Sequence, residues 1–208
     1  MKTDYLKYIK DILTKNHFKL IESKEDNCII YDYRKITNQV IVNISFLRRE
    51  KRLKGFYYGI NFIEMESIVS PILQKNELVG RAYKAENIDD SFYVEKEEKY
   101  NLSDSGVSIY ESETIIEIFN LFYTQESLPF FEKWHNLNVL YEYIKDKESR
   151  EELSEILGQF WQFKKATILR LCNDPNYQNF MDNFVKRREE ILALRPDSVD
   201  VQKILQRL

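Results

Sequence analysis

The sequence predicts an α+β fold in which an N-terminal helix and a small antiparallel sheet of three to five strands pack against a helical C-terminal part. Apolar residues recur at intervals of two between residues 28 and 63, which is typical of half-buried strands. Before and after that stretch they recur at intervals of three and four, which is typical of helices. Only five glycines and four prolines interrupt 208 residues, so long periodic segments dominate over turns.

The first element is expected to be an amphipathic helix that ends at Asn16 and His17, after which the chain turns at "FKLIES" (18–23). The apolar stripe of this helix consists of Tyr5, Tyr8, Ile9, Ile12 and Leu13. Three alternating runs then predict an antiparallel meander with one buried face. They are "CIIYDY" (28–33), "VIVNISF" (40–46) and "FYYGINFI" (56–63).

Residues 77–106 show the weakest pattern of the chain. Just before them, Ser70 is expected to cap a short helix that has Pro71 in its first turn. Within them, "SFYVEKE" (91–97) fits a further strand, and the residues up to Gly106 resemble an exposed loop.

From Ser108 onward the chain is expected to be helical. Ser108 with Glu111 fits a capping box, and Asn136 is suited to cap a later helix. A single long helix is expected from Arg150 to Cys172.

A last pair of helices is separated from this segment by Asp174 and Pro175, a capping residue followed by a first-turn proline. Because no linker is recognisable, the chain is predicted to form a single α+β domain over 1–208. Residues 1–106 would form its helix plus β-meander region, and residues 107–208 its helical region.

Composition limits the classes of function. A net charge of −3 and a pI near 5.6 argue against a general nucleic-acid binder, whose domain is usually basic. No apolar run approaches the roughly 18 residues of a membrane span. The first residues, "MKTDYLKYIKD", carry charges every few positions, so they are not expected to act as a signal peptide. Cys28 and Cys172 stand far apart, so a cytoplasmic protein with reduced thiols is expected.

The inventory of reactive groups predicts no catalytic residue, no metal site and no cofactor. His17 and His135 are the only histidines. His17 fits a helix end and His135 fits a position just ahead of a helix start, and both fit these places better than an acid–base role. No metal-ligand spacing and no glycine-rich phosphate loop occurs. Adjacent acidic residues, such as Glu151 and Glu152, point in different directions on a helix and do not form a carboxylate dyad.

Two charged segments remain as candidate binding surfaces, each of which also fits an ordinary solvated surface. A basic hairpin loop at 48–54 lies between aromatic residues and could hold a nucleic-acid backbone while rings stack on bases. Its cations are Arg48, Arg49, Lys51, Arg52 and Lys54. An acidic span at 86–104 could meet a basic partner protein. Its carboxylates are Glu86, Asp89, Asp90, Glu95, Glu97, Glu98 and Asp104.

The aromatic stretch "LPFFEKWHNLNVLYEYIKD" (128–146) is interpreted as packing. Phe130, Phe131 and Trp134 have the spacing of a buried helical stripe. This segment is expected to dock the helical part on the sheet.

The order of these segments resembles a bacterial group of domains of unknown function. The resemblance rests on a lead helix ending in "NHFKL", a meander closing with "FYYGINF" and a helix running into "SLPFFEKWHNLNVLYEYI", and it covers residues 3 to 145. His17 replaces the glycine that is usual at the first turn. Some related domains are cytosolic immunity proteins that suppress a secreted toxin by binding it. No catalytic residue is implied.

Together these features favour a non-enzymatic, protein-binding module of the bacterial cytosol, similar to an immunity protein, with another protein as its partner. A nucleic-acid-binding protein using the 48–54 loop is one alternative. An enzyme acting through Tyr, Asp and Glu is another, and it would need a deep pocket lined by carboxylates with shifted pKa values.

Overall fold

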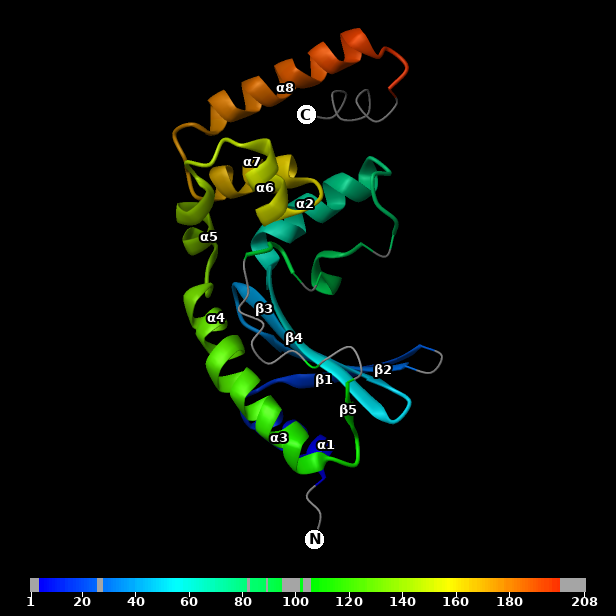
Figure 1. Cartoon of the computed structure of the whole chain (residues 1–208). Coiled ribbons are helices and arrows are strands. Elements are labelled where there is room, and N and C mark those ends of the chain that lie inside the picture. Colours follow the sequence, from blue (N-terminus) through cyan, green and yellow to red (C-terminus); the bar gives the residue numbers. More distant parts are fainter. Residues whose placement is uncertain are drawn as a thin grey trace. The chain divides into compact units, whose positions relative to one another are not determined.

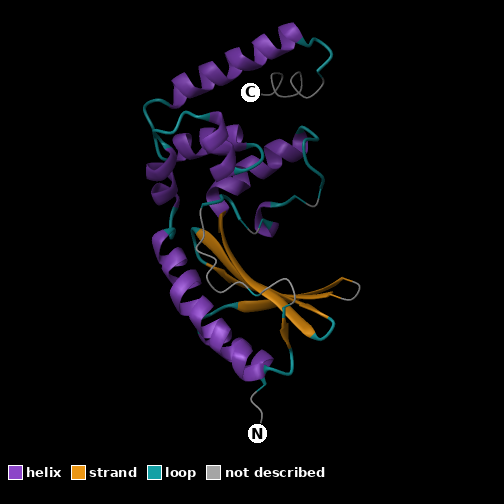
Figure 2. Ribbon diagram, in the orientation of Figure 1, coloured by secondary structure: helices purple, strands orange, loops and turns teal. Residues whose placement is uncertain are grey.

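In the computed structural model, one helix and four consecutive strands come first, a second helix, a 3₁₀ turn and a short strand follow up to residue 108, and the elements described after it are all helical (Figure 1, Figure 2). The structure describes residues 4–25, 28–81, 83–88, 90–94, 102 and 106–198. The first elements are α1 (Tyr5–Lys15), β1 (Lys19–Glu25), β2 (Cys28–Ile36), β3 (Val40–Arg49), β4 (Arg52–Phe62), α2 (Ile63–Lys75), the 3₁₀ turn η1 (Ala85–Asn87) and β5 (Val107–Ser108). The later ones are α3 (Ser112–Leu121), the π-helix η2 (Phe122–Ser127), α4 (Leu128–Lys133), α5 (Leu137–Ile144), α6 (Arg150–Leu157), α7 (Trp161–Leu171) and α8 (Tyr177–Leu194).

The strands form one five-stranded sheet in sequence order, which confirms the predicted α+β class and the antiparallel meander. The expected turn at "FKLIES" is wrong, because β1 occupies this segment. β1 pairs with β2 from Lys19 opposite Arg34 to Glu25 opposite Cys28. Leu20 and Ile21 remain exposed, so β1 lacks the apolar alternation that marks the other strands.

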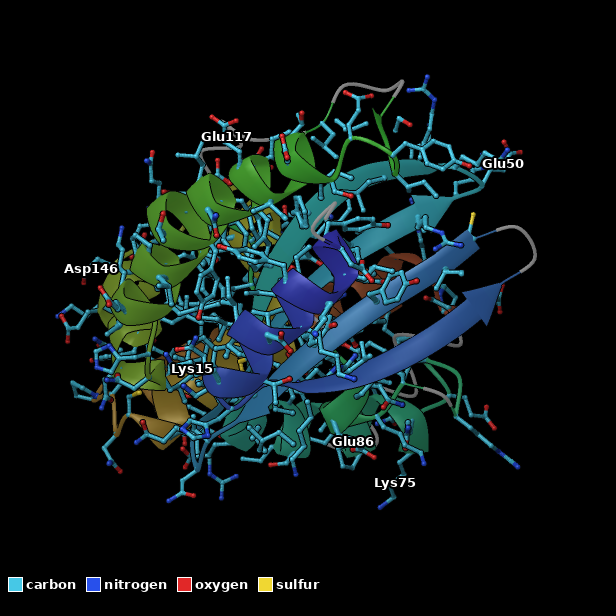
Figure 3. The ribbon with its side chains drawn as sticks, turned by 90° about the horizontal axis from the view of Figure 1, so that it is seen from below. Lys15, Glu50, Lys75, Glu86, Glu117 and Asp146 are labelled. Carbon is cyan, nitrogen blue, oxygen red and sulfur yellow. The ribbon has the colours of Figure 1, made fainter. Side chains whose placement is uncertain are left out.

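Aromatic rings join one face of the sheet to α3, and α1 lies beside α3 and β1 (Figure 3). Phe56 of β4 lies between Phe46 and Phe119, at ring-centroid distances of 5.7 and 5.5 Å. The Tyr8 hydroxyl lies 3.1 Å from Asn120 Oδ1 and links α1 to α3. The predicted stripe of the first helix is therefore confirmed as its inner face.

A π-helical turn leads directly into Pro129 of α4. Proline has no N–H to complete the α-helical ladder, so a wider turn ahead of it lets the helix continue. Ser127 Oγ donates a hydrogen bond to the carbonyl of Tyr123 at 3.0 Å inside this turn. Trp134, at the end of α4, is 3% exposed and lies 6.4 Å from Phe130, as expected for a packing segment.

Two of the predicted helix starts are wrong. α2 begins at Ile63 rather than Ser70, so Pro71 lies inside the helix. Ser108 belongs to β5 and α3 begins at Ser112, so the capping box does not form. In both cases the strand before the helix determines where the helix begins. β4 ends at Phe62, directly before α2, and β5 includes Ser108, which therefore cannot cap α3.

The predicted cap at Asn136 is confirmed by the structure: its Oδ1 accepts a hydrogen bond from the Val139 N–H at 3.2 Å and caps α5. The predicted start at Asp174 and Pro175 is two residues early. Asn176 precedes α8, which begins at Tyr177, and Asp174 Oδ1 accepts from the Asn176 N–H at 2.6 Å in the turn before it. In the segment 91–97, residues 91–94 are not a strand, and 95–97 lie outside the described residues. The second helix of the expected last pair falls in 199–208, which also lie outside them.

The long helix expected from 150 to 172 is two helices, α6 and α7, separated by a tight connection. Gly158 ends α6 with φ 69° and ψ −155°. Phe160 follows in the left-handed conformation, with φ 64°, and precedes α7. The break therefore depends on a backbone conformation that glycine adopts most readily.

Replacing Gly158 by alanine is expected to reduce the free energy of unfolding by about 1–3 kcal/mol, because this combination of dihedral angles is almost restricted to glycine. The new Cβ would also lie 2.7 Å from Cε2 of Tyr93. Urea denaturation should detect the loss. Gly80→Ala is the matched control, since a Cβ added there would meet no atom within 4 Å and the φ of Gly80 is not in the left-handed region. Equal stability of the two variants would contradict the expectation.

The residues group into two units that are each discontinuous in sequence. Unit 1 comprises Met1–Asn61 and Val94–His135, and unit 2 comprises Phe62–Tyr93 and Asn136–Leu208. Their boundaries differ from the expected division at residue 106. The chain passes from one unit to the other at 61–62, 93–94 and 135–136.

Candidate functional site

The two histidines lie at exposed helix ends. His17 follows α1 with φ 68°, and its N–H donates to the carbonyl of Thr14 at 3.0 Å. His135 follows α4, and its Nδ1 lies 2.9 Å from the carbonyl oxygen of Glu132. Both contacts are with the main chain of the preceding helix, as is typical of residues that end helices.

The predicted basic loop is mostly strand. Arg48 and Arg49 end β3, Arg52 and Lys54 belong to β4, and Glu50 and Lys51 form the turn between them (Figure 3). Arg48 lies beside Tyr5. Burial raises the pKa of Tyr5 above its usual value, and the positive charge of Arg48 offsets part of this rise. Arg52 Nη1 donates to the carbonyl of Gly106 at 2.9 Å. Of the flanking rings Phe46, Phe56, Tyr57 and Tyr58, Tyr57 is 50% exposed and the other three are buried. The sequence pattern therefore does not build a stacking platform.

The acidic span is described only at Glu86 and Asp90; its other members, Asp89, Glu95, Glu97, Glu98 and Asp104, lie outside the described residues. Cys28 and Cys172 are free and half-buried. Burial raises the pKa of the Cys172 thiol, and the nearby Glu64 carboxylate raises it further. A raised pKa opposes a nucleophilic thiolate.

An apolar groove of about 400 Å³ lies between α7 and α8 in unit 2, and Arg150 of α6 also lines it. We call it the arginine groove. Its residues are Arg150, Trp161, Gln162, Phe180, Asn183, Phe184, Arg187, Arg188 and Ile191. On α8 these positions recur at intervals of three and four, so one face of the helix carries first aromatic rings and then arginines.

Packing of α8 on α7 fixes the floor of the groove. The Phe163 and Phe184 rings meet edge to face at 5.8 Å. Arg188 stacks its guanidinium 5.1 Å from the centre of the Phe184 ring. With its amide oxygen turned toward them, Gln162 accepts hydrogen bonds at 3.2 Å from Trp161 Nε1 and Arg188 Nη2.

The charges in the arginine groove are unbalanced. Burial lowers the pKa of Arg188, and the positive charges of Arg150 and Arg187 lower it further. Arg187 pairs with Glu190 at 3.7 Å, an exposed contact of little strength. Among the described residues, Arg150 and Arg188 have no carboxylate within 4 Å, and Nε of Arg188 is buried without a hydrogen-bond partner.

A second feature of unit 2 is a polar chamber of about 480 Å³ with Lys164 in its wall. We call it the lysine chamber. It is lined by Tyr83, Lys84, Asn87, Ile88, Asp90, Tyr93, Gln159, Phe160 and Lys164. Lys164 is 4% exposed, and its Nζ donates to the carbonyl of Ser91 at 2.8 Å and lies 3.5 Å from Oε1 of Glu66.

Burial governs the titration of this group of side chains. It raises the pKa of Glu66, against the opposing effects of Lys164 and Ser91, and it lowers the pKa of Lys164, against the opposing charge of Glu66. Burial, with the Glu66 carboxylate and Tyr93 nearby, raises the pKa of Tyr83 to about 12. Tyr83 therefore stays a hydrogen-bond donor at neutral pH.

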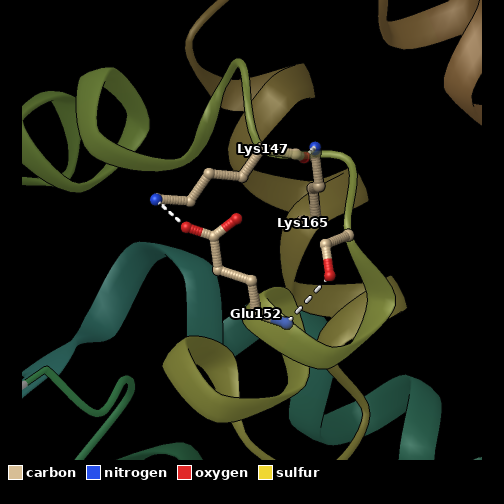
Figure 4. A network of polar contacts seen from close by, with 4 residues as sticks. Lys147, Glu152 and Lys165 are labelled. Atoms are coloured by element: carbon tan, nitrogen blue, oxygen red, sulfur yellow. Dashed lines mark hydrogen bonds and ion pairs between the residues drawn. The ribbon is translucent and has the colours of Figure 1, made fainter.

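The neighbouring Lys165 is equally buried but has a different set of partners (Figure 4). Its Nζ donates to the carbonyl of Lys147, and the ammonium of Lys147 pairs with Glu152. The Glu152 N–H donates to Ser149 Oγ at 3.3 Å. Lys165 thus holds the segment between α5 and α6 against α7, and it does not line the lysine chamber.

The pairing of Glu66 with Lys164 and the arginine groove were not predicted from the sequence. One signal was available: Lys164 lies four residues after Phe160 and four before Ile168, a position where the stripe calls for an apolar residue. Glu66 similarly follows Met65 in a helix whose inner face is apolar. Charged residues at core positions of two helices predict a buried pair, but pairing them requires the tertiary structure.

Comparison of the chain with protein-family models, with curated proteins and with solved structures finds no match. None of the helices in the described part is both long and apolar enough to cross a membrane. Within the described ranges, no three His, Cys, Asp or Glu side chains gather in a way that could hold a metal ion.

Proposed function

We propose that this chain is a non-enzymatic protein-binding module that takes an acidic, aromatic-containing segment of a partner protein in the arginine groove. The observation that carries the proposal is the gathering of Arg150, Arg187 and Arg188 around an aromatic floor. Arginine and tryptophan are the residue types that contribute most to protein interfaces.

The charge of the groove determines the chemistry of the partner. Three guanidinium groups with one exposed carboxylate partner repel each other, and burial strengthens that repulsion at Arg188. A carboxylate entering the groove would relieve the repulsion and could accept two hydrogen bonds from one guanidinium. The apolar floor of Trp161 and Phe180 suits a neighbouring ring or aliphatic side chain of the same segment.

A defined polymer tests this proposal directly. A random copolymer of glutamate and tyrosine should bind the protein more tightly than polyglutamate, because only the copolymer supplies rings for the floor. Replacing both Arg187 and Arg188 by alanine should weaken the binding at least about tenfold, as expected for central arginines of an interface. Fluorescence anisotropy of the labelled copolymer measures both affinities.

Lys186→Ala is the matched control, since Lys186 is an exposed cation of the same helix that does not line the groove. This variant should keep the affinity of the unaltered protein. An equal loss in the Lys186 and arginine variants would mean that only the net charge matters, which contradicts the proposal. Tighter binding of a short DNA duplex than of the copolymer would assign the groove to nucleic acid instead.

An immunity-type role, in which the partner is a bacterial toxin, is the biological form of this proposal. It is supported by the resemblance of residues 3–145 to domains that accompany secreted toxins. The nucleic-acid alternative at the 48–54 hairpin has weaker support, since Arg48 and Arg52 have partners in their own chain and only one flanking ring is exposed.

A further inference from the structure

Lys164, in the wall of the lysine chamber, is a buried lysine that packing alone does not explain. Lysine is rarely buried without a strong pairing partner, because removing its charge from water costs several kcal/mol. The distance from Nζ of Lys164 to Oε1 of Glu66 is 3.5 Å, which is long for a charge-assisted hydrogen bond. Both carboxylate oxygens of Glu66 are buried, and the side chains of Lys164 and Ser91 offset only part of the rise in its pKa that burial causes.

Lys165 shows what a purely structural lysine looks like in the same helix. It is as buried as Lys164, but its amine lies against the carbonyl of Lys147 and does not face the chamber. Lys164 instead combines a buried amine, an adjacent carboxylate and an open volume of about 480 Å³. Burial of the amine favours its neutral, nucleophilic form, the carboxylate can accept and return a proton, and the chamber has room for a carbonyl compound.

We propose that the lysine chamber binds a small aldehyde or ketone and that Lys164 forms an imine with it. The inference is independent of the arginine groove and requires no partner protein. Tyr83 and Asn87 would donate hydrogen bonds to the polar part of the ligand, and Lys84 in the chamber wall favours a ligand that carries a carboxylate.

The reaction balances without any further reagent. The neutral Lys164 amine attacks the carbonyl carbon, so that a C–N bond forms and the carbonyl electron pair moves to oxygen. Glu66 takes one proton from Nζ and delivers it to this oxygen, which gives the neutral carbinolamine. A second proton leaves Nζ and reaches the hydroxyl through Glu66 as the C–O bond breaks, the C=N bond forms and water leaves. The net change is amine plus carbonyl compound giving imine plus water.

The lowered pKa of Lys164 supports this sequence, because a larger share of the amine is neutral at neutral pH than for an exposed lysine. The raised pKa of Glu66 suits a group that both accepts and returns a proton. Burial is the first cause of both shifts, so the chamber itself creates the reactivity.

Reductive trapping tests the proposal on the intact protein. The protein is incubated with glyoxylate and cyanoborohydride, which converts an imine to a stable secondary amine, and the modified residues are located by tandem mass spectrometry. Lys164 should be modified first, at a rate at least about tenfold above that of Lys165, since a desolvated amine beside a ligand site is the activated one. Propionaldehyde, which lacks the carboxylate, should react more slowly at Lys164.

Glu66→Gln should slow modification of Lys164 while leaving exposed lysines such as Lys75 unchanged. Near-ultraviolet circular dichroism checks that this variant is folded. If it is not, the comparison of Lys164 with Lys165 in the unaltered protein still decides the question. Modification that follows exposure, with Lys164 among the last residues to react, would overturn the proposal.

Discussion

Replacing Lys164 by methionine is expected to destabilise the protein by about 3–5 kcal/mol at neutral pH, the usual cost of removing one partner of a buried ion pair. Glu66 is 0% exposed, and its carboxylate would keep no cation within 4 Å among the described residues. The carbonyl of Ser91 would also lose its donor. Urea denaturation at pH 7.5 measures the loss.

The loss should depend on pH in a defined direction. Burial raises the pKa of Glu66 above its ordinary value of 4.5, and removal of Lys164 would raise this pKa further. Above pH 4.5 the folded state then binds more protons than the unfolded state, so stability falls as pH rises through the folded pKa. The Lys164→Met variant should therefore be closest to the unaltered protein below about pH 4.5.

The double variant Glu66→Gln and Lys164→Met provides the control. Because it leaves no buried charge, it should recover more than half of the stability lost in Lys164→Met. If the stability loss of the double variant equals the sum of the losses of Glu66→Gln and Lys164→Met, the two side chains do not interact.

Trp134→Ala is expected to cost about 3–5 kcal/mol, since it removes a large buried side chain and leaves a cavity. The indole is 3% exposed and packs near Phe130, which in turn meets Tyr58 of β4 at 5.0 Å. The ring therefore helps to hold α4 to the sheet. Chemical denaturation followed by far-ultraviolet circular dichroism measures the effect.

Trp161→Ala is the matched control for this prediction. Trp161 is half-buried and lines the arginine groove, so its loss should cost less stability but should weaken binding of the acidic copolymer. A cost below about 1 kcal/mol for Trp134→Ala would mean that its ring adds little to the core.

Much of the fold was predictable because the periodicity of apolar residues reflects which face is buried. The strands β2, β3 and β4 and the helix α1 follow from such stripes. β1 could not be found in this way, because Lys19 to Glu25 shows no alternation and becomes a strand through pairing with β2. The division of α6 from α7 depends on a single glycine, and nothing local distinguishes Gly158 from a tolerated helical glycine.

The candidate sites were predictable only in their parts. Phe180 and Phe184 of α8 have the spacing of a helical stripe in the sequence, but Arg187 and Arg188 further along the helix line a groove only because Trp161 of another helix faces them. Glu66 and Lys164 are about a hundred residues apart, and no short-range pattern connects them. Pairings of this kind depend on tertiary packing, and the periodicity of apolar residues within a short window carries no information about it.

The ion pair between α2 and α7 has a consequence for biosynthesis. Both segments of unit 1 have been translated once His135 is added. Glu66 of α2 is synthesised early, but its partner Lys164 is added only after about a hundred more residues. At roughly 5–20 residues per second, the delay is about 5–20 s. During this time Glu66 and the apolar side of α2 have no partner in α7, so we expect the nascent chain, rather than the finished protein, to be the form that most needs a chaperone.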